Sequence, residues 1–146
     1  MKHKILLLAI GFTTFTAYAQ KMKEADLPVP VKTAFSKQYP GIKSAKWEKE
    51  KENYEAEFDD NKVKTSVLFN ATVSLLETEM ELKTSELPKA VSEYVVKNLA
   101  GKNIKEASKI TNAKGDVTYE TRIGDSNYIF DRWGKFQNKA VENDAD

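Results

Sequence analysis

Residues 53–69 decide the fold of this chain, and they read NYEAEFDDNKVKTSVLF. Apolar side chains occupy alternate positions on both sides of Asp59-Asp60-Asn61. Such alternation is typical of a strand with one buried face, and a cluster of Asp and Asn between two strands is typical of a hairpin turn. A calcium loop at 59–61 is the weaker interpretation, because further carboxylates at fixed spacing and a closing Glu are missing. The stretch therefore predicts an antiparallel hairpin.

The two flanking regions begin with helical patterns. Leu27-Pro28 and Leu87-Pro88 each precede apolar residues at the i, i+4, i+7, i+8 spacing of one helix face. Proline is tolerated in the first turn, where its missing N–H has no partner in any helix. Tyr39-Pro40-Gly41 ends the first pattern and Ala100-Gly101-Lys102 ends the second. We therefore expect one helix in each half of the chain.

The strand patterns also recur in the same order. Residues 53–58 match residues 118–123, and Val67-Leu68-Phe69-Asn70 matches Tyr128-Ile129-Phe130-Asp131. Ser44–Glu50 contains good helix formers, but we predict a strand there because its counterpart, Ile104–Asn112, has a strand pattern. The order predicts an internal duplication and an α+β fold of two tandem repeats. Each repeat would pack one helix on about four antiparallel strands, and together they would form an open sheet with the helices on one face.

The first nineteen residues have the layout of a secretory signal peptide. A basic start at Lys2-His3-Lys4 precedes an apolar stretch at 5–15, and Ala17-Tyr18-Ala19 supplies the small residues that a leader peptidase accepts before Gln20. A retained membrane anchor is disfavoured, because the apolar stretch is about half of the roughly 20 residues that a bilayer requires. We expect cleavage between Ala19 and Gln20 and a periplasmic or secreted product. With no Cys, a lipid anchor on an N-terminal cysteine is excluded.

These boundaries divide the chain into four parts. The prediction places the signal peptide at 1–19, the first repeat at 20–83, the second at 84–141 and a short acidic tail at 142–146. We expect the tail to be a solvated terminus.

Composition excludes several functions. The 146 residues include 23 Lys+Arg, 22 Asp+Glu, no Cys and one His, which is His3 of the predicted leader. The exported chain would therefore lack the residues of Ser-His-Asp and Cys-His triads and of His- or Cys-ligated zinc sites. A net charge near zero argues against nucleic-acid binding. We expect no cofactor and no metal.

A family resemblance rests on residues spread over 24–140. They are Leu27-Pro28, Val31-Lys32, Phe35, Tyr39-Pro40-Gly41, Ala45-Lys46-Trp47-Glu48 and Tyr54–Phe58, then Ser85–Val91, Gly115–Glu120 and Phe130–Phe136. In this pattern the chain resembles the PepSY-like family of small exported bacterial proteins, also called β-lactamase-inhibitor-like. The resemblance implies a helix against a four-stranded antiparallel sheet in each repeat, and it supplies no catalytic residues. One departure is Asn70-Ala71-Thr72-Val73, which lacks the turn glycine found at Gly134.

The candidate contact residues lie on the sheet face turned away from the helices. By alternation, that face carries Glu55, Glu57, Lys64, Leu68, Glu120 and Arg122. We expect it to be open to water, as one face of an antiparallel sheet often is. Trp133, on a loop, is a further candidate contact, although its indole could instead fold over a strand edge.

Catalysis by paired carboxylates is disfavoured. Glu55, Glu57, Glu77, Glu79 and Glu81 alternate along strands with basic residues nearby, which indicates a solvated charged face rather than the buried acid that such chemistry needs. We therefore expect an exported, non-enzymatic binding module with a protein-binding or inhibitor-like role, its partner another exported or envelope protein. A small-ligand or cation binder is the alternative, and a carboxylate-dependent hydrolase is the third hypothesis.

Overall fold

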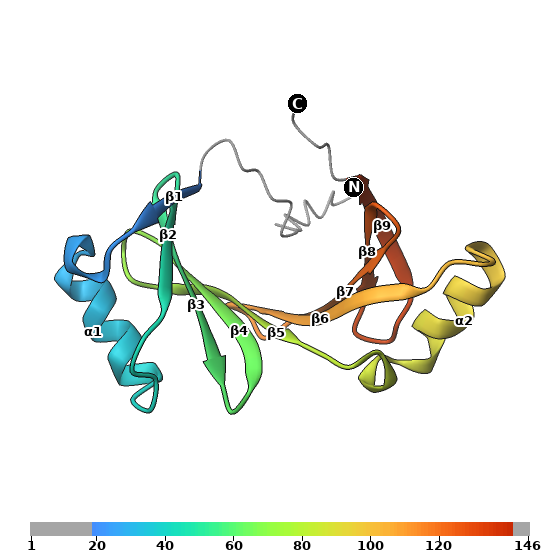
Figure 1. Ribbon diagram of the computed structural model, residues 1–146, viewed down its shortest axis with the longest axis horizontal. Coiled ribbons are helices and arrows are strands. Elements are labelled where there is room, and N and C mark those ends of the chain that lie inside the picture. The colour runs from blue at the N-terminus through green and yellow to red at the C-terminus, as the bar shows by residue number, and fades with distance from the viewer. Residues whose placement is uncertain (1–18, 142–146) are drawn as a thin grey trace, which may run out of the picture.

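The computed structural model describes residues 19–141, which form one antiparallel sheet and two short α-helices (Figure 1). The strands are β1 (Ala19–Met22), β2 (Lys46–Glu50), β3 (Asn53–Asp60), β4 (Val63–Phe69), β5 (Leu75–Glu81), β6 (Ile104–Asn112), β7 (Val117–Ile123), β8 (Ser126–Asp131) and β9 (Phe136–Val141). The helices are α1 (Val29–Gln38) and α2 (Lys89–Asn98), each preceded by a single turn of 3₁₀-helix, at Glu24–Asp26 and Thr84–Glu86. Every strand pairs with its neighbour in sequence, so the spatial order of the strands is their chain order.

The predicted fold class is wrong. The chain is not an α+β arrangement of two repeats with one helix on four strands each, but a mostly-β fold built on a single nine-stranded sheet. β5 and β6 pair continuously from Glu77↔Asn112 to Glu81↔Ser108, so the hydrogen bonds do not stop where the predicted repeats would meet. β1 adds a further strand at the edge, where Met22 pairs with Trp47 of β2.

Each helix packs against one end of this sheet and forms a core there. Val31 and Phe35 of α1 are buried against Trp47 and Phe58, with the Phe35 ring edge-to-face to both at centroid distances of 5.1 and 5.3 Å. These apolar contacts stabilise the helix, since ten residues are too few for a helix to be stable alone in water.

The second core is built in the same manner at the other end. Val91 and Val95 of α2 are buried with Ile123 and Phe130 of the sheet. Tyr94 adds a ring contact to Phe130 at 5.4 Å. The two cores are separate clusters, and the central strands between them carry few large apolar side chains.

The predicted hairpin at 53–69 is confirmed. β3 and β4 pair in register from Tyr54↔Phe69 to Asp60↔Val63, and Asn61 and Lys62 have positive φ angles of 51° and 70°. Positive φ at both central residues belongs to the two-residue turn whose twist matches that of paired strands. The strand predicted over Ser44–Glu50 also forms, as β2, and begins two residues later.

Three other hairpin turns share one hydrogen-bond pattern. They begin at Asn70, Asn112 and Asp131, whose side-chain oxygen accepts hydrogen bonds from the backbone N–H groups two and four residues later. The residue three positions after each has positive φ, and these residues are Val73, Gly115 and Gly134. The turn that lacks a glycine therefore keeps the same geometry with a valine.

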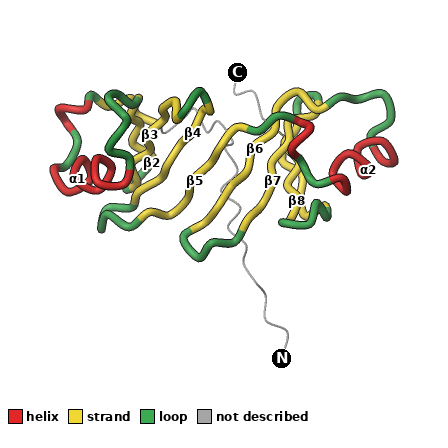
Figure 2. The backbone as a smooth tube through the Cα atoms, turned by 90° about the horizontal axis from the view of Figure 1, so that it is seen from below, coloured by secondary structure: helices red, strands yellow, loops and turns green. Residues whose placement is uncertain are grey.

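The sheet is curved, with both helices on its outer side and the concave side between its two ends (Figure 1). Seen from below, the strands lie side by side across the middle, with α1 and α2 at opposite ends (Figure 2). Residues 1–18 of the predicted leader (1–19) and the acidic tail at 142–146 lie outside the described residues, while the predicted cleavage junction between Ala19 and Gln20 lies within β1. None of the helices in the described part of the chain has the length and hydropathy to span a membrane.

Candidate functional site

The concave face of the sheet is rich in glutamate. Strand alternation sends Ala56, Phe58 and Val67 to the helix side, and the residues between them to the concave side. The charged residues of the concave face are Glu48, Glu50, Glu55, Glu57, Asp59, Glu77, Glu79, Glu81, Glu106, Glu120 and Asp131, with Lys21, Lys46, Lys64 and Arg122. The acidic residues therefore exceed the basic ones here, although the whole chain is almost neutral.

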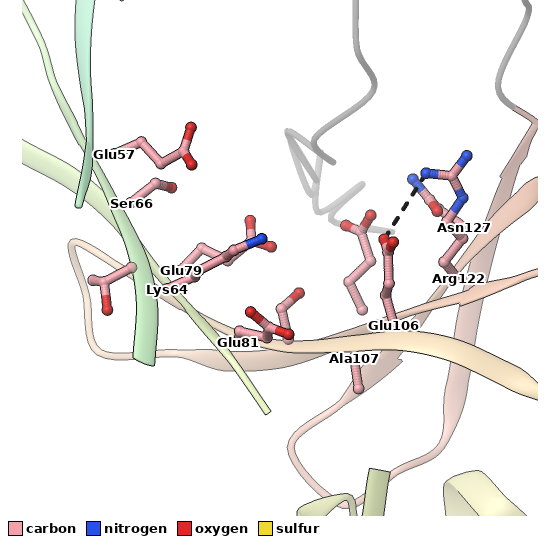
Figure 3. Close-up of a pocket in the computed structure, with 12 residues that line it drawn as sticks. Glu57, Lys64, Ser66, Glu79, Glu81, Glu106, Ala107, Arg122 and Asn127 are labelled. Carbon is pink, nitrogen blue, oxygen red and sulfur yellow. Dashed lines mark ion pairs between the residues drawn. The ribbon is translucent and has the colours of Figure 1, made fainter. Parts of the chain in front are cut away.

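An open hollow of about 340 Å³ lies in the middle of this face (Figure 3). Glu57 and Ser66 approach it from β3 and β4, and Glu79 from β5. Glu106 and Arg122 line it from the opposite side, where their side chains are 3.9 Å apart as an ion pair (Figure 3). The hollow thus joins residues that are far apart in the sequence, because the curvature of the sheet turns their strands toward one another.

The structure brings only some of the predicted contact residues together. Glu57, Glu120 and Arg122 line the hollow, whereas Glu55 lies on the same face outside that lining. Trp133 is 73% exposed on the turn between β8 and β9, with the guanidinium of Arg132 5.4 Å from its ring centroid. That turn packs against the start of α2, so Trp133 does not join the concave face.

The expectation of a face open to water is wrong at three positions. Glu55 is 8% exposed, Glu120 is 7% exposed, and Leu68 is buried beside them. The sheet curves toward this side (Figure 1), and Glu55 and Glu120 lie on interior strands, each with a paired strand on both sides.

Burial changes the acidity of the central carboxyl groups. Loss of water around Glu55, together with the nearby charges of Glu50, Glu48 and Glu79, raises its pKa to about 8, and a hydrogen bond from Ser66 opposes this effect only in part. Burial and the charge of Glu79 raise the pKa of Glu77 to about 7. These groups therefore change protonation near neutral pH.

Glu79 occupies the centre of the face. Burial raises its pKa, and the hydroxyl group of Ser108 donates a hydrogen bond that partly offsets the shift. Its Oε2 atom is buried without a hydrogen-bond partner among residues 19–141. A buried carboxylate oxygen in this condition is destabilising until a donor or a cation reaches it.

The sequence did not reveal several residues of the site. Ser66 and Ser108 form hydrogen bonds to Glu55 and Glu79, but isolated serines in strand patterns carry no signal of that role. Glu106 was missed because its place opposite Arg122 depends on the register of β6 against β7. The alternating glutamates of β3 and β5 were visible as a set, and Glu120 and Arg122 as members of the same face.

The arrangement favours attraction of cations and exchange of protons. No group of three or more His, Cys, Asp or Glu side chains within residues 19–141 is arranged to hold a metal ion. Glu55 and Glu77, whose pKa values lie near neutrality, are outside the lining of the hollow, whereas Glu79, whose pKa burial also raises, lines it beside Glu81.

No protein-family model and no curated protein matches the chain. Solved structures do match. A DUF2874 family protein from Bacteroides uniformis superposes with a TM-score of 0.73 at 19% identity, covering 79% of this chain and 89% of that one. A BLIP-like protein from Bacteroides fragilis has a TM-score of 0.62 at 22% identity, covering 82% and 91%.

A third solved structure, of a Bacteroides eggerthii protein provisionally described as periplasmic, has a TM-score of 0.71 at 19% identity, covering 78% and 88%. At these identities the likeness concerns the fold. The chain therefore has the fold of the DUF2874 and BLIP-like proteins of Bacteroides, whereas the PepSY-like resemblance and the tandem duplication stay predictions.

Proposed function

We propose that this protein is an exported, non-enzymatic binding module of the periplasm and that the concave face is its contact surface for another protein. One observation carries the proposal: both helices pack on the outer side of the sheet, and no described element covers the charged concave side (Figure 1). A broad polar surface of this kind fits a macromolecular partner better than an enclosed apolar pocket would.

Two further lines of support concern location and role. The predicted leader would direct the chain out of the cytoplasm. The structural neighbours include a protein provisionally described as periplasmic and a BLIP-like protein, so the same location and an inhibitor-like role form part of the proposal. Glu55, Glu57, Glu120 and Arg122 would belong to the contact surface, and Trp133 would form a separate apolar contact near α2.

A pull-down with charge-exchanged variants tests the proposal. The tagged protein, expressed from its full sequence in its own cells, is crosslinked and captured from periplasmic extract. Replacing Glu57→Lys together with Arg122→Glu reverses two charges of the contact surface without changing net charge. The matched control, Lys89→Glu with Glu93→Lys, exchanges an exposed ion pair of α2 on the outer side.

We expect one stoichiometric partner that the wild type and the α2 control capture and that the concave-face variant loses. Equal capture by all three proteins would contradict the proposed surface, and the absence of any stoichiometric partner would contradict the proposed function. In that case, thermal-shift screening tests for a small-ligand binder, since a ligand at about 100 times its dissociation constant adds about 2.7 kcal/mol of stability. A pH–rate profile that disappears when one Glu is removed tests for a hydrolase.

A further inference from the structure

The centre of the concave face carries more negative than positive charge, because the glutamates that line its hollow outnumber the two basic residues there, Lys64 and Arg122. Lys46 and Glu57 form an ion pair at 3.7 Å, and Arg122 and Glu106 form another at 3.9 Å, one toward each end of the face. Between them lie Glu77, Glu79 and Glu81 of β5, opposite neutral residues of β6.

The spacing of these three side chains is that of an extended polypeptide. Alternate residues of a strand lie on one face roughly 7 Å apart. Cationic side chains at every second position of an extended segment repeat at the same distance, so a segment lying along β5 would place one of them near each glutamate. The open hollow of about 340 Å³ beside Glu79 and Glu81 can receive side chains, but it is too small for a folded domain.

An inorganic cation suits the face less well. Calcium takes six to eight oxygen ligands that converge on one point. Here the carboxyl groups stand in parallel along strands, and residues 19–141 contain no cluster that could hold a metal. Separate cationic side chains can contact separate carboxylates without such convergence.

The protonation of the carboxyl groups on this face also favours a cationic ligand. The pKa of Glu77 is raised to about 7 by burial and by Glu79, and that of Glu55 to about 8 by burial and by Glu50, Glu48 and Glu79. In register, Glu77 faces Leu68 on β4 and Asn112 on β6, neither of which offers a positive charge. A cation brought close would favour ionised carboxylates, so binding would release protons.

We propose that the concave face binds an extended, cationic segment of its partner protein, with Lys or Arg at alternate positions along β5. This inference rests on the proposed function and names the chemistry of the partner's contact segment.

Isothermal titration calorimetry on the protein expressed from its full sequence tests the inference. The probe is a short peptide of alternating Lys and Ser, with alternating Glu and Ser as its comparison and calcium chloride alone as a third titrant. We expect the Lys peptide to bind, more tightly at about pH 8 than at about pH 6 because the carboxyl groups then carry their charge. The Glu peptide should not bind, and calcium should not displace the Lys peptide.

The matched variants remove the same charge from different places. The variant with Glu79→Gln and Glu81→Gln should bind the Lys peptide at least about tenfold more weakly than the wild type does. The variant with Glu52→Gln and Glu93→Gln, at exposed positions away from the concave face, should bind it as the wild type does. Thermal melts show whether each variant is folded. Absence of Lys-peptide binding, equal binding by both variants, or displacement by calcium would overturn the inference.

Competition in the pull-down separates this inference from the proposed function. A partner captured through the concave face should be released by the Lys peptide and not by the Glu peptide. A partner whose capture depends on Glu57 and Arg122, but which the Lys peptide does not release, would contradict the inference of a cationic segment. The proposed function as a binding module would then still hold.

Discussion

Val73 and Gly134 occupy the same position in two turns of the same geometry, with backbone φ angles of +68° and +82°. Each follows an Asx residue by three positions, and each donates its backbone N–H to the carbonyl oxygen of that residue at 2.9 Å. The left-handed region costs little for glycine but roughly 1–2 kcal/mol for a residue with a Cβ atom. The left-handed backbone conformation therefore costs more at Val73 than at Gly134, and substitutions at the two positions can measure the difference.

Gly134→Ala should destabilise the protein. A Cβ atom at this position would lie 3.0 Å from Pro88 Cβ and 3.1 Å from Ala90 Cβ, at the start of α2, in addition to the strain of the φ angle. We expect a loss of about 2–4 kcal/mol in the free energy of unfolding, measured by urea denaturation. Gly101→Ala, with φ +80° but open space around it, should cost less and serves as the control.

Val73→Gly should be close to neutral. The substitution relieves the unfavourable φ angle, but it removes a half-buried side chain that packs on the α1 core. Half-burial of a valine side chain contributes about 1 kcal/mol, which is similar to the backbone strain that the substitution removes. A change of more than about 2 kcal/mol in either direction would show that one of the two effects has been misjudged.

Glu55→Gln should stabilise the protein at alkaline pH. The pKa of Glu55 is about 8 in the folded protein and 4.5 as a free group. Between pH 4.5 and about pH 8, Glu55 therefore keeps its proton in the folded protein and loses it in the unfolded chain. Stability from this group is therefore present below pH 4.5 and is lost as pH rises toward about 8. We expect the glutamine variant to be about 1–3 kcal/mol more stable near pH 8 and to show a smaller slope of stability against pH.

The control for this prediction is Glu52→Gln, which changes an exposed carboxylate in the turn between β2 and β3. Its thermal melts should follow those of the wild type at every pH. A wild type and a Glu55→Gln variant with identical pH profiles would contradict the raised pKa.

N-terminal sequencing of the exported protein should find Gln20 as its first residue. Gln20, Lys21 and Met22 would then remain to pair with β2. Met22 is half-buried against the α1 core, so Met22→Ala should lower the free energy of unfolding by about 1–2 kcal/mol, whereas Lys21→Ala should have little effect. A neutral Met22→Ala would indicate that β1 does not form in the exported protein.

The local parts of this fold could be predicted because they depend on local chemistry. Alternation in 53–69 and the Asp-Asp-Asn cluster were enough for the β3–β4 hairpin, and the proline-led apolar patterns were enough for the two helices. The class of the fold could not be predicted in this way. Whether β5 pairs with β6 depends on two strands separated by α2, and alternation within each strand does not report its neighbour.

The candidate site was less predictable than the strands. Alternation identified the face on which Glu55 and Glu120 lie, but not the curvature that buries them, because curvature arises from twist accumulated over many strands. The register that places Glu106 opposite Arg122 likewise leaves no mark on the residue pattern. Residue types therefore predicted which groups share a surface, and the backbone determined which of them meet.

The sequential order of the strands affects how the chain reaches its native state. Six of the eight strand pairings join strands linked by a short turn, and the other two, β1 with β2 and β5 with β6, span the segments that contain α1 and α2. Contacts of short sequence separation cost less loop-closure entropy and speed folding. The sheet can consequently grow in one direction as the chain emerges, with α1 and α2 docking after the strands that follow them have formed.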